Sequence, residues 1–244
     1  MELSKRLQTV ADAVTVGNRV ADVGTDHGYV PIYLVKNHLA PGGVAMDVNK
    51  GPLKRARENI LKEKLSEKIE CRLGNGLKSL QTDEADTIII AGMGGDLICQ
   101  ILKESPEFLR HGKELVLQPQ SEWFKVRLLL EDYEYAIRKE WFLKEDGKYY
   151  VIIKALPASK GNAQKMTPME AAYGKYLLEE KNPVLSEYLK KELAKKEKIA
   201  LGLKNLMEEE SGGEASSENN RGKKGERYRE LINEIQEIKT IVEL

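Results

Sequence analysis

Residues 20–31, which read VADVGTDHGYVP, decide the expected fold. An apolar strand runs into a turn with two glycines, two acids and a histidine, and the chain then continues as a helix. Gly24 and Gly28 can adopt backbone angles that other residues avoid, and they let a ligand approach the main chain closely. The spacing D-x-G-x-D-x-G differs from the G-x-G-x-x-G turn of nicotinamide-binding proteins. Its acids favour a positively charged ligand, such as a sulfonium or amino group, over a pyrophosphate; the alternative is an ordinary strand-to-helix turn.

The composition is that of a globular protein with balanced charge. The chain has 244 residues, of which 41% are apolar and 32% charged, enough to bury a core in one or two domains. Its 39 basic and 39 acidic side chains also balance on either side of Pro157, so a nucleic-acid partner would need a local basic patch. The only cysteines, Cys71 and Cys99, have no metal-ligand spacing and indicate a reducing compartment. Because no apolar run approaches 18 residues, we expect a soluble, cytoplasmic protein.

Hydrophobic patterning predicts alternating strands and helices before residue 157. Apolar runs predict strands at 19–23, 44–48, 69–73, 86–91 and 114–117, and helical patterns occupy 2–14, 30–37, 51–64, 97–103 and 123–132. Residues 135–142 and 149–155 predict a closing antiparallel hairpin. The run at 86–91 is the most continuously β-branched, so we expect it at the centre of a parallel sheet. This order predicts a doubly wound α/β domain over residues 1–156.

Glycine-bearing and polar turns follow all five of the predicted parallel strands. Ligands of doubly wound sheets bind outside the carboxyl ends of the strands, so these turns predict one site. In chain order they hold Asp22, Gly24, Thr25, Asp26, His27 and Gly28; Asp47 and Val48; Asn75 and Gly76; Gly92, Met93, Gly94 and Gly95; and Gln118 and Pro119. Asp47 follows Gly24 at about the distance at which such folds place the carboxylate for ribose hydroxyls. Ribose carboxylate, glycine turn and Asn-Gly turn together fit S-adenosylmethionine.

Parts of this predicted site allow more than one interpretation. His27 either takes a direct part in the site or only hydrogen-bonds within its turn. A basic cluster on the helix at 51–64 and just before it is either a solvated helix face or a phosphate contact. Its members are Lys50, Lys54, Arg55 and Arg57. Methyltransferases that act on exocyclic amines carry Asn/Asp-Pro-Pro-aromatic where this chain reads AGMGG at 91–95, so the chain lacks the residues that grip such an amine.

From Pro157 onward the sequence is helical in pattern and highly charged, which predicts a second domain over residues 157–244. Helical patterns occupy 168–180 and 184–210, and the low-complexity polar stretch 211–225 predicts a flexible loop. The long helix carries apolar Leu185, Leu189, Leu193, Ile199, Leu203 and Leu206, and the last helix carries Tyr228, Leu231, Ile235, Ile238 and Val242. The heptad rhythm of the last helix predicts an antiparallel coiled-coil hairpin; the alternative is the core of a small helical subdomain.

Four stretches of the chain resemble a known family. They read SKRL at 4–7, ADVGTDHGYVP at 21–31, AGMGG at 91–95 and LQP at 117–119. Their combination is similar to the bacterial tRNA (adenine-N1)-methyltransferases of the TrmK type, and the resemblance extends over essentially the whole chain. It implies a class I, Rossmann-like methyltransferase fold, S-adenosylmethionine as cofactor, and methylation of N1 of adenine 22 in tRNA.

Together, the turns and the resemblance assign expected contacts. We expect the cofactor to contact Asp22, Gly24, Thr25, Gly28, Asp47, Val48, Asn75, Gly76, Gly92, Met93 and Gly94. We expect tRNA to contact Arg6, Gly95, Gln118 and Pro119, and the hairpin residues Lys195 and Arg227, although interleaved glutamates leave a solvated surface as the alternative there. No metal and no membrane partner are expected, and the protein should be a monomer or a weak homodimer.

The chemistry of the target base suggests a mechanism. Adenine N1 has a free lone pair, so we expect direct attack on the sulfonium methyl group without prior deprotonation. The product is cationic, so a nearby carboxylate would stabilise the developing charge; Asp26 is the candidate, with His27 beside it. Two other classes remain open. A small-molecule methyltransferase would not need the helical hairpin, and a non-catalytic protein would bind S-adenosylmethionine or RNA without transfer.

Overall fold

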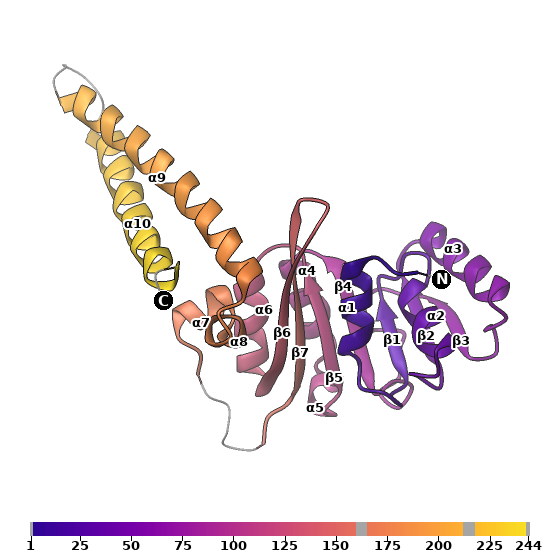
Figure 1. Ribbon diagram of the computed structural model, residues 1–244. Helices are drawn as coiled ribbons and strands as arrows, with labels where there is room; N and C mark the ends of the chain where they lie inside the picture. Colours follow the sequence, from indigo (N-terminus) through magenta and orange to yellow (C-terminus); the bar gives the residue numbers. More distant parts are fainter. Residues whose placement is uncertain (1, 160–164, 212–217, 243–244) are drawn as a thin grey trace. The chain divides into compact units, whose positions relative to one another are not determined.

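The computed structural model describes residues 2–159, 165–211 and 218–242, with the backbone alone at 209–211 and 218–223. The chain divides into two compact units, one up to Leu177 and one from Leu178 onward. The first unit contains a seven-stranded sheet with helices, and the second contains two long helices (Figure 1).

One sheet organises the first unit, in the strand order β3-β2-β1-β4-β5-β7-β6. The parallel strands are β1 (Val20–Val23), β2 (Gly43–Asp47), β3 (Ile69–Leu73), β4 (Thr87–Met93) and β5 (Glu114–Pro119). β7 (Lys148–Pro157) is antiparallel to β5, and β6 (Tyr135–Glu145) is antiparallel to β7. The winding reverses between β1 and β4, which is where sheets of this kind bind their ligands.

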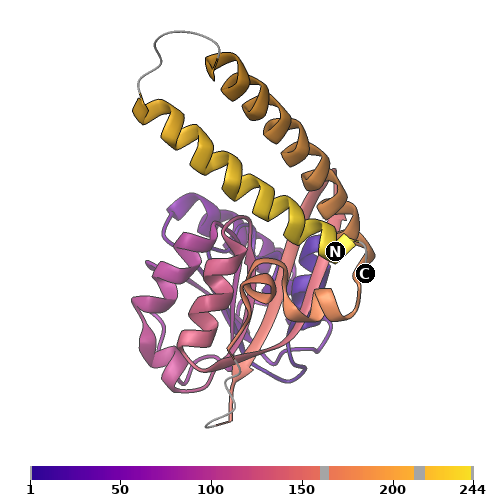
Figure 2. The same cartoon turned by 90° about the vertical axis from the view of Figure 1, so that its left-hand side faces the viewer.

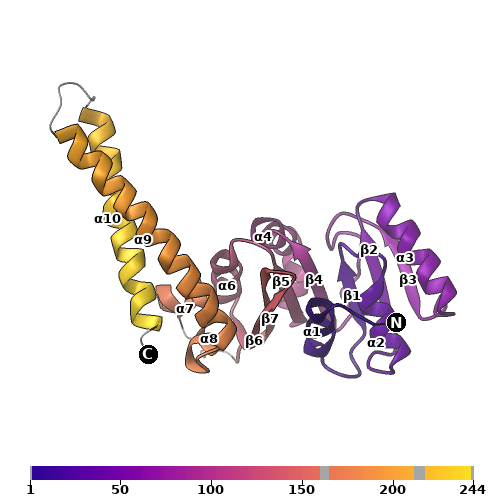
Figure 3. The same cartoon turned by 45° about the horizontal axis from the view of Figure 1, so that its top comes forward.

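Helices cover both faces of this sheet (Figure 3). On one face, α1 (Lys5–Ala13) and α2 (Tyr29–Lys36) share a buried core with Ile89, Val116 and Ile152 of the sheet. On the other face lie α4 (Gly95–Lys103) and α6 (Trp123–Asp132). The remaining helices are α3 (Lys50–Lys62), α5 (Pro106–Arg110), α7 (Pro168–Tyr173) and α8 (Lys175–Glu179). The arrangement confirms the predicted doubly wound α/β fold.

The predicted elements of the sheet domain occur within three residues of their expected bounds, and the differences gather at the carboxyl edge. β4 continues through Gly92 to Met93, with an irregularity in its pairing after Ala91. The β6–β7 ladder extends beyond the end of β5 to the pair Glu145–Lys148. This extension of the ladder forms an arm beside that edge (Figure 1). α5 was not expected, because five residues are too few to show a helical period.

The segment after the sheet belongs to the first unit, although the sequence predicts a domain boundary at residue 156. Arg127 of α6 donates through Nη1 to the carbonyl oxygen of Ala171 at 2.9 Å and through Nε to Glu140 at 2.7 Å. Both charged side chains are completely buried. The hydrogen bond from Arg127 to Ala171 joins α7 to the sheet domain, and the first compact unit ends after Leu177.

The second unit contains α9 (Pro183–Ser211) and α10 (Glu218–Val242), which lie side by side as antiparallel helices (Figures 1 and 2). Ala200, Leu231 and Ile235 form the buried core between them. Across the pair, Nζ of Lys239 lies 2.7 Å from Oε1 of Glu197. The expected hairpin is therefore formed within one chain, while a coiled-coil supercoil stays a prediction.

Two details of this unit differ from the sequence prediction. Ile199 and Leu206, expected on the buried stripe, are 47% and 48% exposed, whereas Ala200 is buried. Leu193, Ala200 and Leu203 pack in the core between the helices at the positions of one heptad repeat, and Ile199 lies outside that repeat. The predicted loop at 211–225 is also shorter, because Ser211 ends α9 and residues 218–225 belong to α10. Residues 212–217 lie outside the described part of the chain.

Candidate active site

The turn after β1 is held by its neighbours on both sides. The backbone N–H groups of Gly24 and Thr25 both donate to the carbonyl oxygen of Met46 at 2.8 Å. Gly24 has a φ of +77°, and a Cβ atom there would lie 1.9 Å from Cε of Met93. Gly28, with a φ of +68°, caps α2. Gly24 is therefore required both by its positive φ and by the contact with Met93, and the positive φ favours glycine at position 28.

Asp22 is a carboxyl group buried at the end of β1. Thr25 donates to it through Oγ1 at 2.5 Å, and no other hydrogen bond reaches its side chain from the described residues. Burial raises the pKa of Asp22 to about 6; the hydrogen bond from Thr25 opposes this shift, and the charge of Asp47 adds to it. Such a carboxylate attracts a cationic or hydrogen-bond-donating group of a ligand, which fits the amino acid moiety of S-adenosylmethionine.

Asp47 and the Asn75–Gly76 turn lie at adjacent strand ends. Oδ1 of Asp47 accepts a hydrogen bond from the backbone of Asn49 at 2.6 Å. The N–H of Gly74 donates to the carbonyl oxygen of Asp47 at 3.0 Å, so the Asn75–Gly76 turn starts directly beside this residue. Val48 is 60% exposed and offers an apolar surface for a base. The structure therefore brings these predicted residues together at one edge of the sheet, and their contact with adenosine stays a prediction.

A pocket of about 320 Å³ lies between the turns after β1 and β4. Predicted residues that line it include Arg6, Asp22, Gly24, Asp26, His27 and Gly92. The residues around Asp47 and Asn75, which are predicted to contact adenosine, lie outside this lining. Most of the predicted cofactor residues thus fall into two groups, one at the β2 and β3 ends and one at the pocket, whereas Gly28, Met93 and Gly94 are not part of the pocket lining.

Asp26, the candidate for stabilising positive charge, lies at the pocket with 60% of its side chain exposed. Oδ1 of Asp26 accepts hydrogen bonds from Nη2 and Nε of Arg55 at 2.8 and 3.2 Å. Nε2 of His27 lies 3.5 Å from the same oxygen. His27 itself has a φ of +66°, and its carbonyl oxygen accepts from Asn59 at 2.9 Å. Arg55, considered above as part of a basic cluster, is therefore the ionic partner of Asp26.

Arg6 is fixed in the wall of the pocket. Its Nη1 donates to Oε1 of Gln118 at 2.7 Å, and its guanidinium carbon lies 5.5 Å from the ring centre of Tyr150. Its backbone N–H donates to Glu145 of the β6–β7 arm at 3.3 Å. Gln118 is completely buried, so it acts on the site only through Arg6.

Packing explains some of the residues in the turn after β4 and at the end of β5. A Cβ atom at Gly95 would lie 2.5 Å from the carbonyl oxygen of Ser121. Gly94 is the N-cap residue of α4, and Pro119 is buried at the end of β5. These residues shape the edge of the site, and the predicted contacts of Gly95 and Pro119 with tRNA stay predictions.

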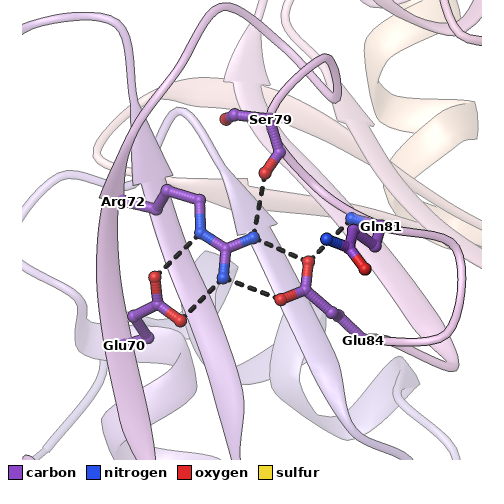
Figure 4. A network of polar contacts seen from close by, with 5 residues as sticks. All are labelled: Glu70, Arg72, Ser79, Gln81 and Glu84. Atoms are coloured by element: carbon purple, nitrogen blue, oxygen red, sulfur yellow. Dashed lines mark hydrogen bonds and ion pairs between the residues drawn. The ribbon is translucent and has the colours of Figure 1, made fainter.

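An ion-pair network holds the loop that follows β3 (Figure 4). Arg72 of β3 donates to both carboxylate oxygens of Glu84, at 2.6 and 2.7 Å, and to both of Glu70, at 2.6 and 2.8 Å. It also donates to the carbonyl oxygen of Ser79 at 2.9 Å. The hydrogen bonds from Arg72 lower the pKa of Glu84 to about 2. Because the loop begins with the Asn75–Gly76 turn, the network anchors this turn to β3.

Five residues that line the pocket were not predicted from the sequence: Leu7, Tyr29, Val30, Ala91 and Gln120. Tyr29 follows Gly28 directly, within the same motif, and its ring stacks on that of His27. Gln120 follows Pro119, and its backbone N–H donates to the carbonyl oxygen of Met93 at 2.8 Å. Tyr29 and Gln120 stand next to predicted site residues in the sequence, and this position could have identified them.

Lys195 and Arg227 belong to the second unit and pair with its glutamates. Nζ of Lys195 lies 3.9 Å from Glu192, and Nη1 of Arg227 lies 3.0 Å from Glu230. Their contact with tRNA stays a prediction. In the described part of the chain, no group of three or more His, Cys, Asp or Glu residues could hold a metal ion. None of the helices described there is long and apolar enough to cross a membrane.

Comparison with known proteins shows the family of this chain. A family model described as TrmK, tRNA (adenine(22)-N(1))-methyltransferase, matches residues 20–236. The tRNA (adenine(22)-N(1))-methyltransferase of Bacillus subtilis strain 168 is 39% identical over 193 residues, which cover 78% of this chain and 80% of the relative.

Solved structures of similar proteins contain the expected cofactor or its product. Sp1610 of Streptococcus pneumoniae, in complex with S-adenosyl-L-methionine, has a TM-score of 0.81 and 33% identity, and the match covers 99% of this chain and 100% of that one. TrmK of M. capricolum, in complex with S-adenosyl-homocysteine, has a TM-score of 0.81 and 28% identity, with 100% and 99% covered. The chain thus belongs to the TrmK family of tRNA (adenine(22)-N(1))-methyltransferases, S-adenosylmethionine-dependent enzymes with a Rossmann-like fold.

Proposed function

We propose that this protein methylates N1 of adenine 22 in tRNA. The observation that carries the proposal is the pocket that joins the cofactor turn at Asp22 and Gly24 to Gly92. Gly92 has no side chain, and φ there is +80°. The backbone therefore lines the pocket at the point where methyltransferases that act on exocyclic amines grip the amine. Membership of the TrmK family supports the choice of adenine N1 as acceptor.

The residues of the chain have distinct tasks in this reaction. Asp22 and the Gly24 turn would hold the amino acid part of the cofactor, and Asp47 would hold the ribose. When bound, S-adenosylmethionine supplies a methyl group on a cationic sulfur, which the lone pair of adenine N1 accepts without prior loss of a proton. Asp26 would then stabilise the positive charge that develops on the purine ring. Arg6, fixed by Gln118, lines the same pocket and would limit how the base can enter.

The role of Asp26 can be separated from its ion pair with Arg55. Asp26→Asn should lower turnover by about tenfold to a hundredfold, less than for a group fully excluded from water, and leave cofactor affinity within about twofold. Arg55→Gln removes the same ion pair but keeps the carboxylate, so it should retain turnover. Single-turnover rates and calorimetric cofactor affinities measure both. Equal losses in the two variants would make the ion pair, and not the carboxylate, the functional unit.

The proposed function is tested by methyl transfer from labelled S-adenosylmethionine to unmodified tRNA transcripts. One transcript carries adenine at position 22, and the control carries guanine there. We expect label on the adenine transcript alone, at N1. Label on both transcripts would mean a different target base, and label on neither would overturn the proposal.

A further inference from the structure

The pocket has two aromatic side chains in its lining, His27 and Tyr29. Their rings are stacked, with centroids 5.0 Å apart and planes inclined by 9°. Tyr29 is the first residue of α2, and His27 is fixed by the hydrogen bond from Asn59 to its carbonyl oxygen. The pair is therefore a preformed aromatic surface, fixed by its backbone on both sides of Gly28.

An adenine inside a folded tRNA has to leave its stack to reach such a pocket, at a cost of a few kcal/mol. Proteins recover this cost by stacking the base on an aromatic ring or an arginine plane. The arginine of this pocket, Arg6, already places its guanidinium on Tyr150 and donates to Gln118. The remaining flat surface is the Tyr29 ring, which is half-buried and makes no side-chain hydrogen bond to the described residues.

We propose that Tyr29, backed by His27, is the platform on which the target adenine stacks in the pocket. The inference rests on the proposed function, since it assigns the base-binding surface of that same site. It assigns Tyr29 a task that is distinct from cofactor binding. It also gives a reason for an aromatic residue directly after Gly28, the cap of α2: the first residue of a helix has a fixed backbone, which fixes the direction of its ring.

The test compares Tyr29→Leu, which removes the plane, with Tyr29→Phe, which keeps it. The control is Tyr33→Leu, because Tyr33 lies one turn further along α2, outside the pocket lining, with its hydroxyl bonded to Gln8 at 2.9 Å. We expect Tyr29→Leu to lower kcat/KM for tRNA by about tenfold to a hundredfold, with Tyr29→Phe and Tyr33→Leu within about threefold of the wild type. Cofactor affinity should be unchanged in all three.

A second readout follows the base directly. The tRNA carries 2-aminopurine at position 22, whose fluorescence rises on leaving the stack and is quenched when it stacks on an aromatic side chain. Binding of Tyr29→Leu should raise the fluorescence above that of free tRNA, because the base leaves its stack without an aromatic partner, whereas wild type and Tyr29→Phe should stay below that level. Because this signal comes from bound tRNA, a fall in activity caused by partial unfolding would not produce it.

Four results would overturn the inference. These are full activity of Tyr29→Leu, an equal loss in Tyr29→Phe, a matching loss of cofactor affinity, or an unquenched base in the wild type. If the wild type does not methylate adenine 22, the proposed function fails and takes the inference with it. If the wild type is active and Tyr29→Leu is equally active, only the inference fails.

Discussion

The two ends of the parallel sheet each bury a carboxyl group, and the surroundings of these groups are opposite. At the amino end, Glu114 accepts hydrogen bonds from the backbone and hydroxyl of Thr15 and from Thr87, and Nζ of Lys154 lies 3.0 Å away. At the carboxyl end, Asp22 accepts one hydrogen bond, from Thr25, within the described part of the chain.

The pKa values of the two groups shift accordingly. Burial alone would raise the pKa of Glu114, but the hydrogen bonds from Thr15, Lys154 and Thr87 outweigh it and keep the pKa below its usual value. Burial raises the pKa of Asp22 to about 6 because its single hydrogen bond does not offset the loss of water. The amino end is thus built for stability. At the carboxyl end, the carboxylate of Asp22 lacks a cationic partner among the described residues, and a ligand can supply one. Its burial lowers the stability of the protein without ligand.

The largest effect is expected at the amino end. Glu114→Ala leaves Lys154, Thr15 and Thr87 without their acceptor, and we expect it to destabilise the protein by about 3 kcal/mol. For a chain of this size the melting temperature should fall by about 6–12 °C. Thermal unfolding and cofactor titration measure the two quantities. A variant that melts like the wild type, or that loses more than about threefold in cofactor affinity, would contradict a purely stabilising role of Glu114.

The carboxyl end should respond with the opposite sign. The pKa of Asp22 is about 6 in the fold, against an ordinary value of 3.8 for an aspartate, so the folded state holds the proton more tightly. Below both values Asp22 has no effect. As pH rises from about 4 to above 6, its ionisation costs the fold up to about 3 kcal/mol. Asp22→Asn should therefore be more stable than the unliganded wild type at pH 8, but not at pH 4.

The same substitution should weaken the site. Loss of the Asp22 charge should lower cofactor affinity by about tenfold to a hundredfold, equivalent to one or two hydrogen bonds to a charged group. Melting curves at pH 4 and pH 8 without cofactor, with a cofactor titration at pH 8, cover both claims. A variant that is less stable than the wild type at pH 8 would contradict the burial argument.

Local rules were enough to predict most of the fold and the place of the site. The run Ile88–Ile90 was expected at the centre of the sheet, and all three residues are completely buried in β4. The turns at Asp22–Gly28 and Gly92 were expected at one edge, because parallel strands bring their carboxyl ends together. They do line one pocket. Spacing along the chain carries this information by itself.

Partners that are distant in sequence could not be predicted. Arg6 and Gln118 are 112 residues apart, and Asp26 and Arg55 are 29 apart, so no local period relates them. The same limit explains the boundary at residue 177, which depends on a buried arginine in α6. These contacts decide which predicted residues face the pocket and which only support it.

The smallest expected effect tests whether a fully paired network at the site edge serves stability, like Glu114, or the ligand, like Asp22. Arg72 binds two carboxylates, and each can be neutralised separately. Glu70 lies on β3 beside Arg72, whereas Glu84 belongs to the loop that starts at Asn75. Glu84→Gln should loosen the loop and raise KM for S-adenosylmethionine by about threefold to tenfold at unchanged kcat, since a hydrogen bond to a charged group contributes about 1.5 kcal/mol or less at a partly exposed site.

Glu70→Gln is the matched control, because it removes the same charge from the same guanidinium without freeing the loop. Its KM should stay within about twofold of the wild type, and both variants should melt within about 4 °C of it. If Glu84→Gln and Glu70→Gln have equal KM values and equal losses of melting temperature, the Arg72 network serves stability, as Glu114 does. A rise in KM confined to Glu84→Gln would mean that the carboxyl edge uses ion pairs to position its loops, while Asp22 leaves a charge for the ligand.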